Sequence, residues 1–313
     1  MARIAILSTI SIAALALAGC AATPTVDDGR VHIVASTNVY GSIAESIGGD
    51  LVSVTSLIDS AAQDPHSFEA SASDQLAISK ADLVIENGGG YDPFVDVLVQ
   101  ASSSTPVLLS ASEASGLLEG DHDHAEDEAK EDEDHDGHDH IEGFNEHVWY
   151  SLHGMQHVAE ELAHELSELD PDNAATFEAN LEAFAGQLES LEATAEQLHA
   201  EANGRSAAIT EPVPVYLLEA VGLSNATPDE FSEAIEEGTD VPPAVLAETL
   251  DAIGGASLLA YNSQTASPET EQVRQAAERA GVPVVEFGET LPDGEDYISW
   301  MTANLAAISA ALR

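Results

Sequence analysis

The stretch "DPDNAATFEANLEAFAGQLESLEATAEQLHAE" (170–201) predicts one unusually long helix. We expect Asp170 to be its N-cap, Pro171 to lie in its first turn, and the Asn-Gly pair at 203–204 to end it. Apolar residues recur along it at spacings of three and four, namely Phe177, Leu181, Phe184, Leu188, Leu191, Ala195 and Leu198. At ~1.5 Å per residue the helix would be roughly 45 Å long. It would therefore span a small domain.

Short apolar strands alternate with helices on both sides of this segment. The expected strands are 31–37, 51–58, 81–88, 105–110, 206–210, 256–262 and 282–287, and the later helices lie near 215–221 and 268–280 and from Glu295. Such alternation predicts parallel sheets covered on both faces. We expect an α/β fold of two lobes, each with a parallel sheet flanked by helices, joined by one long rigid helix. The N-terminal lobe would be 31–169, the bridging helix 170–204 and the C-terminal lobe 205–313.

The first twenty residues, "MARIAILSTISIAALALAGC", have one basic residue and then an apolar stretch whose length is typical of a secretory signal. The end of this stretch, "LAGC" (17–20), resembles the lipobox of bacterial lipoproteins. We expect a signal peptide at 1–19, a lipidated Cys20, and a tether over 20–30 that holds the protein at the outer face of the cell membrane. The alternative is an ordinary cysteine. No other cysteine is present, which excludes disulfides and thiolate metal sites.

The charge is strongly negative, at −49, from 57 acidic and 8 basic residues. Nucleic acid and anionic lipid are therefore poor partners, and cations are the natural ligands. The segment 119–141 is too polar and too like-charged to pack, so we expect a solvated loop. Its histidines could collect metal weakly or sense it, or they could be incidental; they are His122, His124, His135, His138 and His140.

Four further residues follow predicted strands or begin ordered segments: His66, His147, Glu211 and Glu289. Ligands of open α/β sheets bind at the carboxyl ends of the strands. Two imidazoles and two carboxylates there predict a divalent-metal site in the cleft between the lobes. Each of the four residues could also have an ordinary role instead of binding metal. The histidines could be surface or core residues, Glu211 could cap a helix, and Glu289 could lie on a solvated face.

The segment "DPHSFEASASDQLAISKADLVIENGGGYDPFVDVL" (64–98), then "EHVWYS" (146–151) and the long helix resemble the substrate-binding lipoproteins of zinc and manganese ABC transporters. The resemblance runs from about Val31 to Leu312. It implies that His66 and His147 are the ligands of the N-terminal lobe. Glu211 stands where manganese-type members have Glu and zinc-type members usually have His. Glu289 stands where the family normally has Asp, and it reaches one methylene further.

The resemblance implies a non-catalytic monomer that captures a divalent metal and delivers it to an ABC permease. The two carboxylates favour Mn²⁺ or Fe²⁺, whereas the histidine-rich insertion and the usual order of affinities favour Zn²⁺. From the sequence we favour Zn²⁺, with Mn²⁺ or Fe²⁺ as the alternative. A metal buffer or adhesin without a transporter is a second class of function.

A zinc hydrolase is a third class of function, but "HVAEELAH" (157–164) is neither HExxH nor HxxEH. We therefore do not expect an enzyme. His153 and His157 lie four residues apart, a spacing that can chelate a metal. From the sequence we favour an ordinary exposed or core pair.

Overall fold

The computed structural model describes residues 29–63, 65–120, 141 and 143–313, apart from the side chains of His66 and Glu119. The expected signal segment, Cys20 and the five histidines of the 121–140 run lie outside the described residues. Those expectations therefore stay predictions. Within the described part of the chain, no helix is both long and apolar enough to cross a membrane.

Two four-stranded parallel sheets form the centres of the two lobes, which confirms the expected α/β fold. The strand orders are β2-β1-β3-β4 and β6-β5-β7-β8. Their bounds are β1 Val31–Thr37, β2 Val52–Ile58, β3 Leu83–Glu86, β4 Val107–Ser110, β5 Ser206–Ile209, β6 Ser224–Asn225, β7 Leu259–Asn262 and β8 Val284–Phe287. The sequence pattern missed β6, because its two residues are both exposed and carry no hydrophobic signal.

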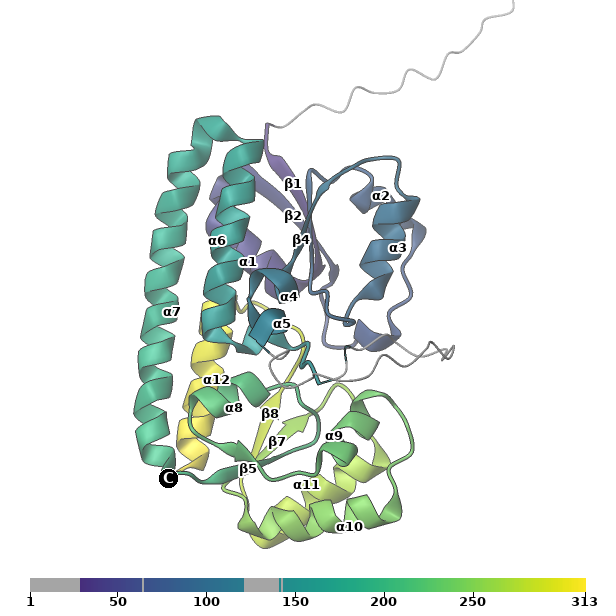
Figure 1. Cartoon of the computed structure of the whole chain (residues 1–313), viewed down its shortest axis with the longest axis vertical. Coiled ribbons are helices and arrows are strands. Elements are labelled where there is room, and N and C mark those ends of the chain that lie inside the picture. The colour runs from purple at the N-terminus through teal and green to yellow at the C-terminus, as the bar shows by residue number, and fades with distance from the viewer. Residues whose placement is uncertain (1–28, 64, 121–140, 142) are drawn as a thin grey trace, which may run out of the picture.

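Helices cover both faces of each sheet (Figure 1). In the first half they are α1 Asn38–Gly48, α2 Ala72–Ile78, α3 Pro93–Ala101, α4 Ala111–Ala114, α5 Leu117–Gly120 and α6 Leu152–Leu169. After the long helix α7 (Ala174–Ala202) come α8 Val215–Ala220, α9 Asp229–Glu236, α10 Pro243–Ala252, α11 Pro268–Ala280 and α12 Tyr297–Ala311. The last helix begins two residues later than Glu295, because the Asp296 carboxylate caps it by accepting from the Ser299 backbone N–H (2.7 Å).

Helix α7 is 29 residues long, or ~43 Å at the usual rise. It begins later than the sequence predicts, because 171–173 form a 3-10 turn that Asp170 precedes. The Asp170 carboxylate accepts from the Asn173 side-chain amide (2.6 Å) and does not cap the α-helix. Asn203 ends the helix in the left-handed conformation (φ 50°), as expected. Of the predicted apolar stripe, all residues but the half-buried Leu181 are buried.

The two sheets share one continuous core. On β1, Ile33 and Ala35 face this shared core, while Val34 faces a second cluster under α2 and α3. On β7, Ala260 faces the shared core and Tyr261 faces a third cluster under α9, α10 and α11. Helices α1, α6, α7 and α12 also contribute to the shared core. Burial on both faces explains why the strands read as apolar runs in the sequence.

Helix α12 also joins the two halves. It begins beside α1 and packs along α7 toward the C-terminus (Figure 1). The Tyr297 hydroxyl donates to the Trp149 carbonyl (2.7 Å), and the Tyr297 N–H donates to the Ser42 hydroxyl (3.0 Å). The carboxyl ends of both sheets are therefore held in a fixed relation by two helices and their hydrogen bonds.

Candidate metal centre

His147 precedes the 3-10 turn Val148–Tyr150 and is fully buried. Its Nδ1 lies 2.7 Å from the side-chain oxygen of Asn145, which also accepts from the His147 backbone N–H (3.1 Å). Because an amide oxygen can only accept, the ring proton belongs on Nδ1. This leaves Nε2 with the lone pair that a metal requires.

Asn145 fixes this imidazole against the second half of the protein. Its side-chain amide donates to the Pro212 carbonyl (3.1 Å), and its own carbonyl accepts from the Tyr216 hydroxyl (2.9 Å). Both contacts reach the segment that begins with Glu211. One asparagine therefore ties the His147 ring to the loop that carries a predicted carboxylate ligand.

Aromatic rings fix the orientation of the imidazole. The ring of His147 meets Trp149 edge-on (centroids 5.1 Å apart) and Tyr91 edge-on (5.9 Å), and both neighbours are fully buried. Edge-to-face contacts of this kind are directional. The imidazole is therefore positioned before any ligand arrives.

Glu211 lies two residues after β5 and is buried. The Thr265 hydroxyl donates to its carboxylate and lies 2.6 Å from each of the two oxygens. A single hydroxyl proton shared between both oxygens orients the carboxylate, whose oxygens are acceptors of the kind that bind a cation.

Glu289 lies two residues after β8 and is also buried. Its Oε1 accepts from the Asn262 side-chain amide (2.8 Å) and its Oε2 from the Tyr91 hydroxyl (3.1 Å). Burial, and then the charge of Glu289, raise the pKa of the Tyr91 hydroxyl. Tyr91 thus contacts both His147 and Glu289, which brings these predicted ligands from opposite halves to one ring.

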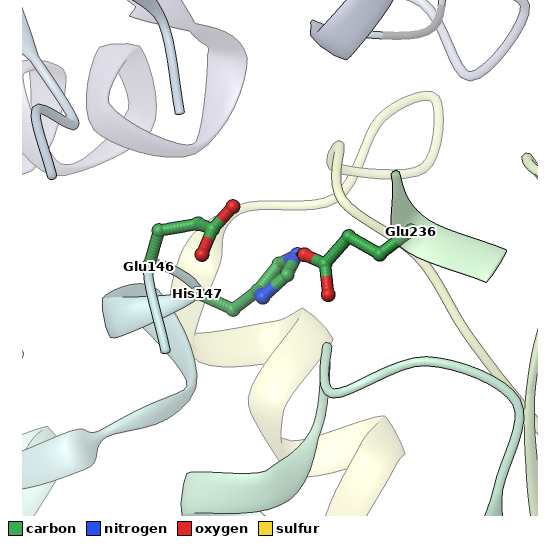
Figure 2. A group of neighbouring side chains, drawn as sticks. All are labelled: Glu146, His147 and Glu236. Carbon is green, nitrogen blue, oxygen red and sulfur yellow. The ribbon is translucent and has the colours of Figure 1, made fainter. Parts of the chain in front are cut away.

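Glu236, the last residue of α9, enters the same site. Its side chain is 10% exposed, and its Oε1 lies 3.4 Å from His147 Nε2. Figure 2 shows Glu236 reaching from the second half of the chain toward the His147 ring, with Glu146 beside it. One ligand atom from each of Glu146, His147 and Glu236 lies within 4.8 Å of the others. This spacing can hold one metal ion.

The electrostatics of Glu236 connect it to the other carboxylates. Burial raises its pKa first, followed by the charges of Glu146, Glu211 and Glu289 and a hydrogen bond with Glu146. Four carboxyl groups therefore act on one another in one buried site. Carboxyl groups this close together resist ionising at the same time, so some of them favour the protonated form. A bound divalent cation would instead favour their ionised form.

The structure brings together three of the four predicted ligands, His147, Glu211 and Glu289. The backbone of His66 lies in a 3-10 turn (Pro65–Ser67) soon after β2, as expected from the sequence. Its side chain is outside the described part, so its role stays a prediction.

Sequence reasoning missed Glu236. The helix that carries it has a detectable signal, with Phe231, Ala234 and Ile235 on one buried face and Gly238 just beyond its end. The residue itself has none, because it is one of 57 acidic residues. Only the path of α9 over the second sheet shows that its carboxylate points inward.

The chain is similar to a family of known proteins over most of its length. The family model for the periplasmic zinc-uptake complex component A matches residues 33–311. A manganese ABC transporter substrate-binding lipoprotein of Streptococcus gordonii is 27% identical over 320 residues, 96% of each chain. An iron ABC transporter substrate-binding lipoprotein of Streptococcus pyogenes is 26% identical over 97% of this chain and 96% of its own.

A solved substrate-binding protein of Pseudomonas aeruginosa in complex with Mn²⁺ has the same fold. Its TM-score is 0.70 at 23% identity, over 90% of this chain and 98% of that one. The chain therefore belongs to the zinc-uptake complex component A family and is a metal-binding protein of an ABC transporter, not an enzyme.

Proposed function

We propose that this protein captures one divalent metal ion between its two sheets and delivers it to an ABC permease. The proposed ligands are His66, His147, Glu211 and Glu289, with Glu236 as an additional ligand. The observation that carries the proposal is the contact of the buried His147 ring with Glu236, inside a group of buried carboxylates. Each predicted carboxylate ligand is also held by hydrogen bonds from neighbouring side chains.

We propose Mn²⁺ or Fe²⁺ as the preferred cargo, with Zn²⁺ as the alternative. The sequence alone favoured zinc because of the histidine-rich run, which lies outside the described residues. Glu236 adds a third carboxylate to the predicted two, and oxygen ligands suit Mn²⁺ better than imidazoles do. The relatives named for manganese and iron support the same choice. Zinc remains a competitor because it binds most mixed sites more tightly than manganese.

We also propose how the protein is anchored and what its histidine-rich run does. A signal peptide over 1–19 and lipidation of Cys20 would anchor a monomer at the outer face of the cell membrane. The 121–140 run would bind metal weakly, because its polar and like-charged sequence favours no packed core that could preorganise a tight site. The lipoprotein relatives support the anchor.

Metal analysis and calorimetry of the tag-free protein without its signal segment test this proposal. We expect one tight equivalent of metal in the full-length form and in a form that lacks 120–141, with direct competition between Zn²⁺ and Mn²⁺. His147→Ala, or Glu289→Gln if the alanine variant is unstable, should lose that equivalent. The ligand set would be refuted if tight metal binding disappeared on deletion of 120–141 and survived both His147→Ala and Glu289→Gln.

Transport distinguishes delivery from simple buffering. In a strain without this gene, the wild-type chain should restore metal uptake and His66→Ala should not. Uptake that is unaffected by the deletion would instead support an extracellular metal buffer or adhesin.

A further inference from the structure

A second group of metal-binding side chains lies on α6, away from the site between the sheets. His153 and His157 are one helical turn apart, and their Nε2 atoms are 3.3 Å from each other. Their rings meet edge-on with centroids 4.7 Å apart. His153 is exposed and the His157 side chain is 42% exposed, so an ion in solution can reach both nitrogens.

The separation of the two nitrogens matches that of a chelate. Zinc–imidazole bonds are about 2.0–2.1 Å long, and at a tetrahedral angle this places two nitrogens about 3.3–3.4 Å apart. The observed Nε2–Nε2 distance of 3.3 Å agrees with this value. One cation could therefore contact both Nε2 atoms at ordinary bond lengths.

Glu160 prepares one of the two rings for this role. Its Oε2 lies 3.4 Å from His157 Nδ1, and its Oε1 accepts from the Gln156 side-chain amide (3.0 Å). A carboxylate beside Nδ1 favours the proton on that nitrogen and leaves the Nε2 lone pair free to bind a metal. The His153 ring then offers either a proton or, once a metal replaces that proton, a second lone pair.

The surroundings favour a cation. His153 also lines a groove of about 220 Å³ between α6 and α7 whose wall includes Glu192, Glu196 and His199. The chain as a whole carries a net charge of −49. Negative groups around an exposed imidazole pair raise the local concentration of divalent cations.

We propose that His153 and His157 form a second, surface metal site for an imidazole-preferring divalent cation such as Zn²⁺. The site is distinct from the one between the sheets in residues and in ligand type. It has nitrogen ligands where the inner site is rich in carboxylates, so it would take zinc even if the inner site prefers manganese. It does not depend on the proposed function, because its ligands lie outside the inner site.

Histidine modification with diethyl pyrocarbonate, read by peptide mass spectrometry, tests the site in the full chain because each histidine reports on itself. The inner site is first filled with Mn²⁺, and Zn²⁺ is then added. At a free concentration ten times the Kd of the surface site, modification of His153 and His157 should slow about tenfold. His164 is the matched control, since it is exposed on the same helix with Glu168 3.8 Å away and has no second imidazole beside it in the described structure.

The variants decide whether the two rings act as a pair. His157→Ala should raise the Zn²⁺ concentration that protects His153 at least tenfold, whereas His164→Ala should leave it unchanged. Equal protection of His164, or protection of His153 that survives His157→Ala, would overturn the proposal. The outcome is independent of metal binding at His147, which the calorimetry above measures separately.

Discussion

Replacing Glu236 by Gln should raise the stability of the metal-free protein. The side chain is 10% exposed, and burial together with three neighbouring carboxylates raises its pKa well above the usual range for Glu. A carboxyl group with a raised folded-state pKa favours folding below its unfolded pKa, and that contribution is lost as the pH rises. At pH 7 the loss of folding stability caused by burying Glu236 cannot exceed about 3 kcal/mol. This limit is the free energy of protonating such a group at that pH. Gln avoids this cost, so Tm should rise by several degrees at pH 7 and very little near pH 4.5.

The same substitution should weaken metal binding. Loss of a carboxylate that contacts the cation lowers affinity about 10- to 100-fold by analogy with supporting residues of other metal sites. A metal present at 1,000 times its Kd stabilises the wild-type protein by about 4 kcal/mol. After a hundredfold loss of affinity, the same concentration would add only about 1.4 kcal/mol. The variant should therefore melt higher than the wild type without Mn²⁺ and gain less from it.

Thermal melts at pH 7 and pH 5, with and without Mn²⁺, measure both effects, and calorimetry gives the affinity. Glu237→Gln is the matched control, because Glu237 is the next residue and is exposed. It removes the same charge from the chain and should change neither measurement. If Glu236→Gln melted below the wild type without metal and kept the full metal-induced shift, Glu236 would be a structural partner of His147 and not a ligand.

Three further outcomes follow from the geometry. Thr265→Val removes the hydroxyl that orients Glu211 and keeps the side-chain shape, so calorimetry should show roughly tenfold weaker metal binding with little change in Tm. Burial, and then the charge of Asp92, raise the pKa of Glu86 to about 8. The stabilising effect of protonated Glu86 is therefore complete below pH 4.5 and is lost as the pH rises through 8. Glu86→Gln should therefore gain about 2 kcal/mol over the wild type at pH 8, after allowance for solvent screening, and nothing at pH 4.5, as measured by urea unfolding. In hydrogen exchange, amides of 235–241 should exchange faster than those of 288–291 in the metal-free protein, and metal should slow the former.

Much of the fold could be predicted because its strands are buried on both faces and its long helix has one apolar stripe. β6 could not, since two exposed residues leave no pattern. The sequence analysis did not locate α9, although its buried apolar face and Gly238 leave a signal, nor α10, of which only Val245 and Thr249 are buried. Helix α7 was placed correctly at its end but three residues early at its start, because a proline-led 3-10 turn and the first turn of an α-helix share the same sequence signal.

The candidate site also contains residues that the sequence could predict and one that it could not. Glu211 and Glu289 could be selected because parallel sheets gather the residues that follow their strands, and His147 because it begins the ordered segment after the acidic loop. Glu236 reaches the site from the far end of a helix, so its place depends on tertiary geometry that no local spacing encodes. The proposed preference for Mn²⁺ or Fe²⁺ depends on the same residue, whereas the sequence favours zinc because of the histidine-rich run and the usual order of affinities.

The contacts between the two halves indicate how a bound metal could leave. The segment 288–291, which contains Glu289, accepts hydrogen bonds from the hydroxyls of Tyr150 (2.8 Å) and Tyr91 (3.1 Å). Asn38 exchanges two more with it, at 2.9 and 3.1 Å. At about 1 kcal/mol each, a wide opening would lose about 4 kcal/mol here, besides the shared core.

Movement of Glu236 has a much lower cost. It ends a short helix and is followed by exposed residues 237–240, of which Gly238 has a φ of +64°. Such a segment can shift without breaking the shared core or the bonds to 288–291. We therefore expect the Glu236 end of α9 to open first and free one side of the cation, while His147 and Glu289 stay fixed by their neighbours. Slower exchange at 288–291 than at 235–241 is the direct consequence, and the reverse order would indicate a hinge between the two halves.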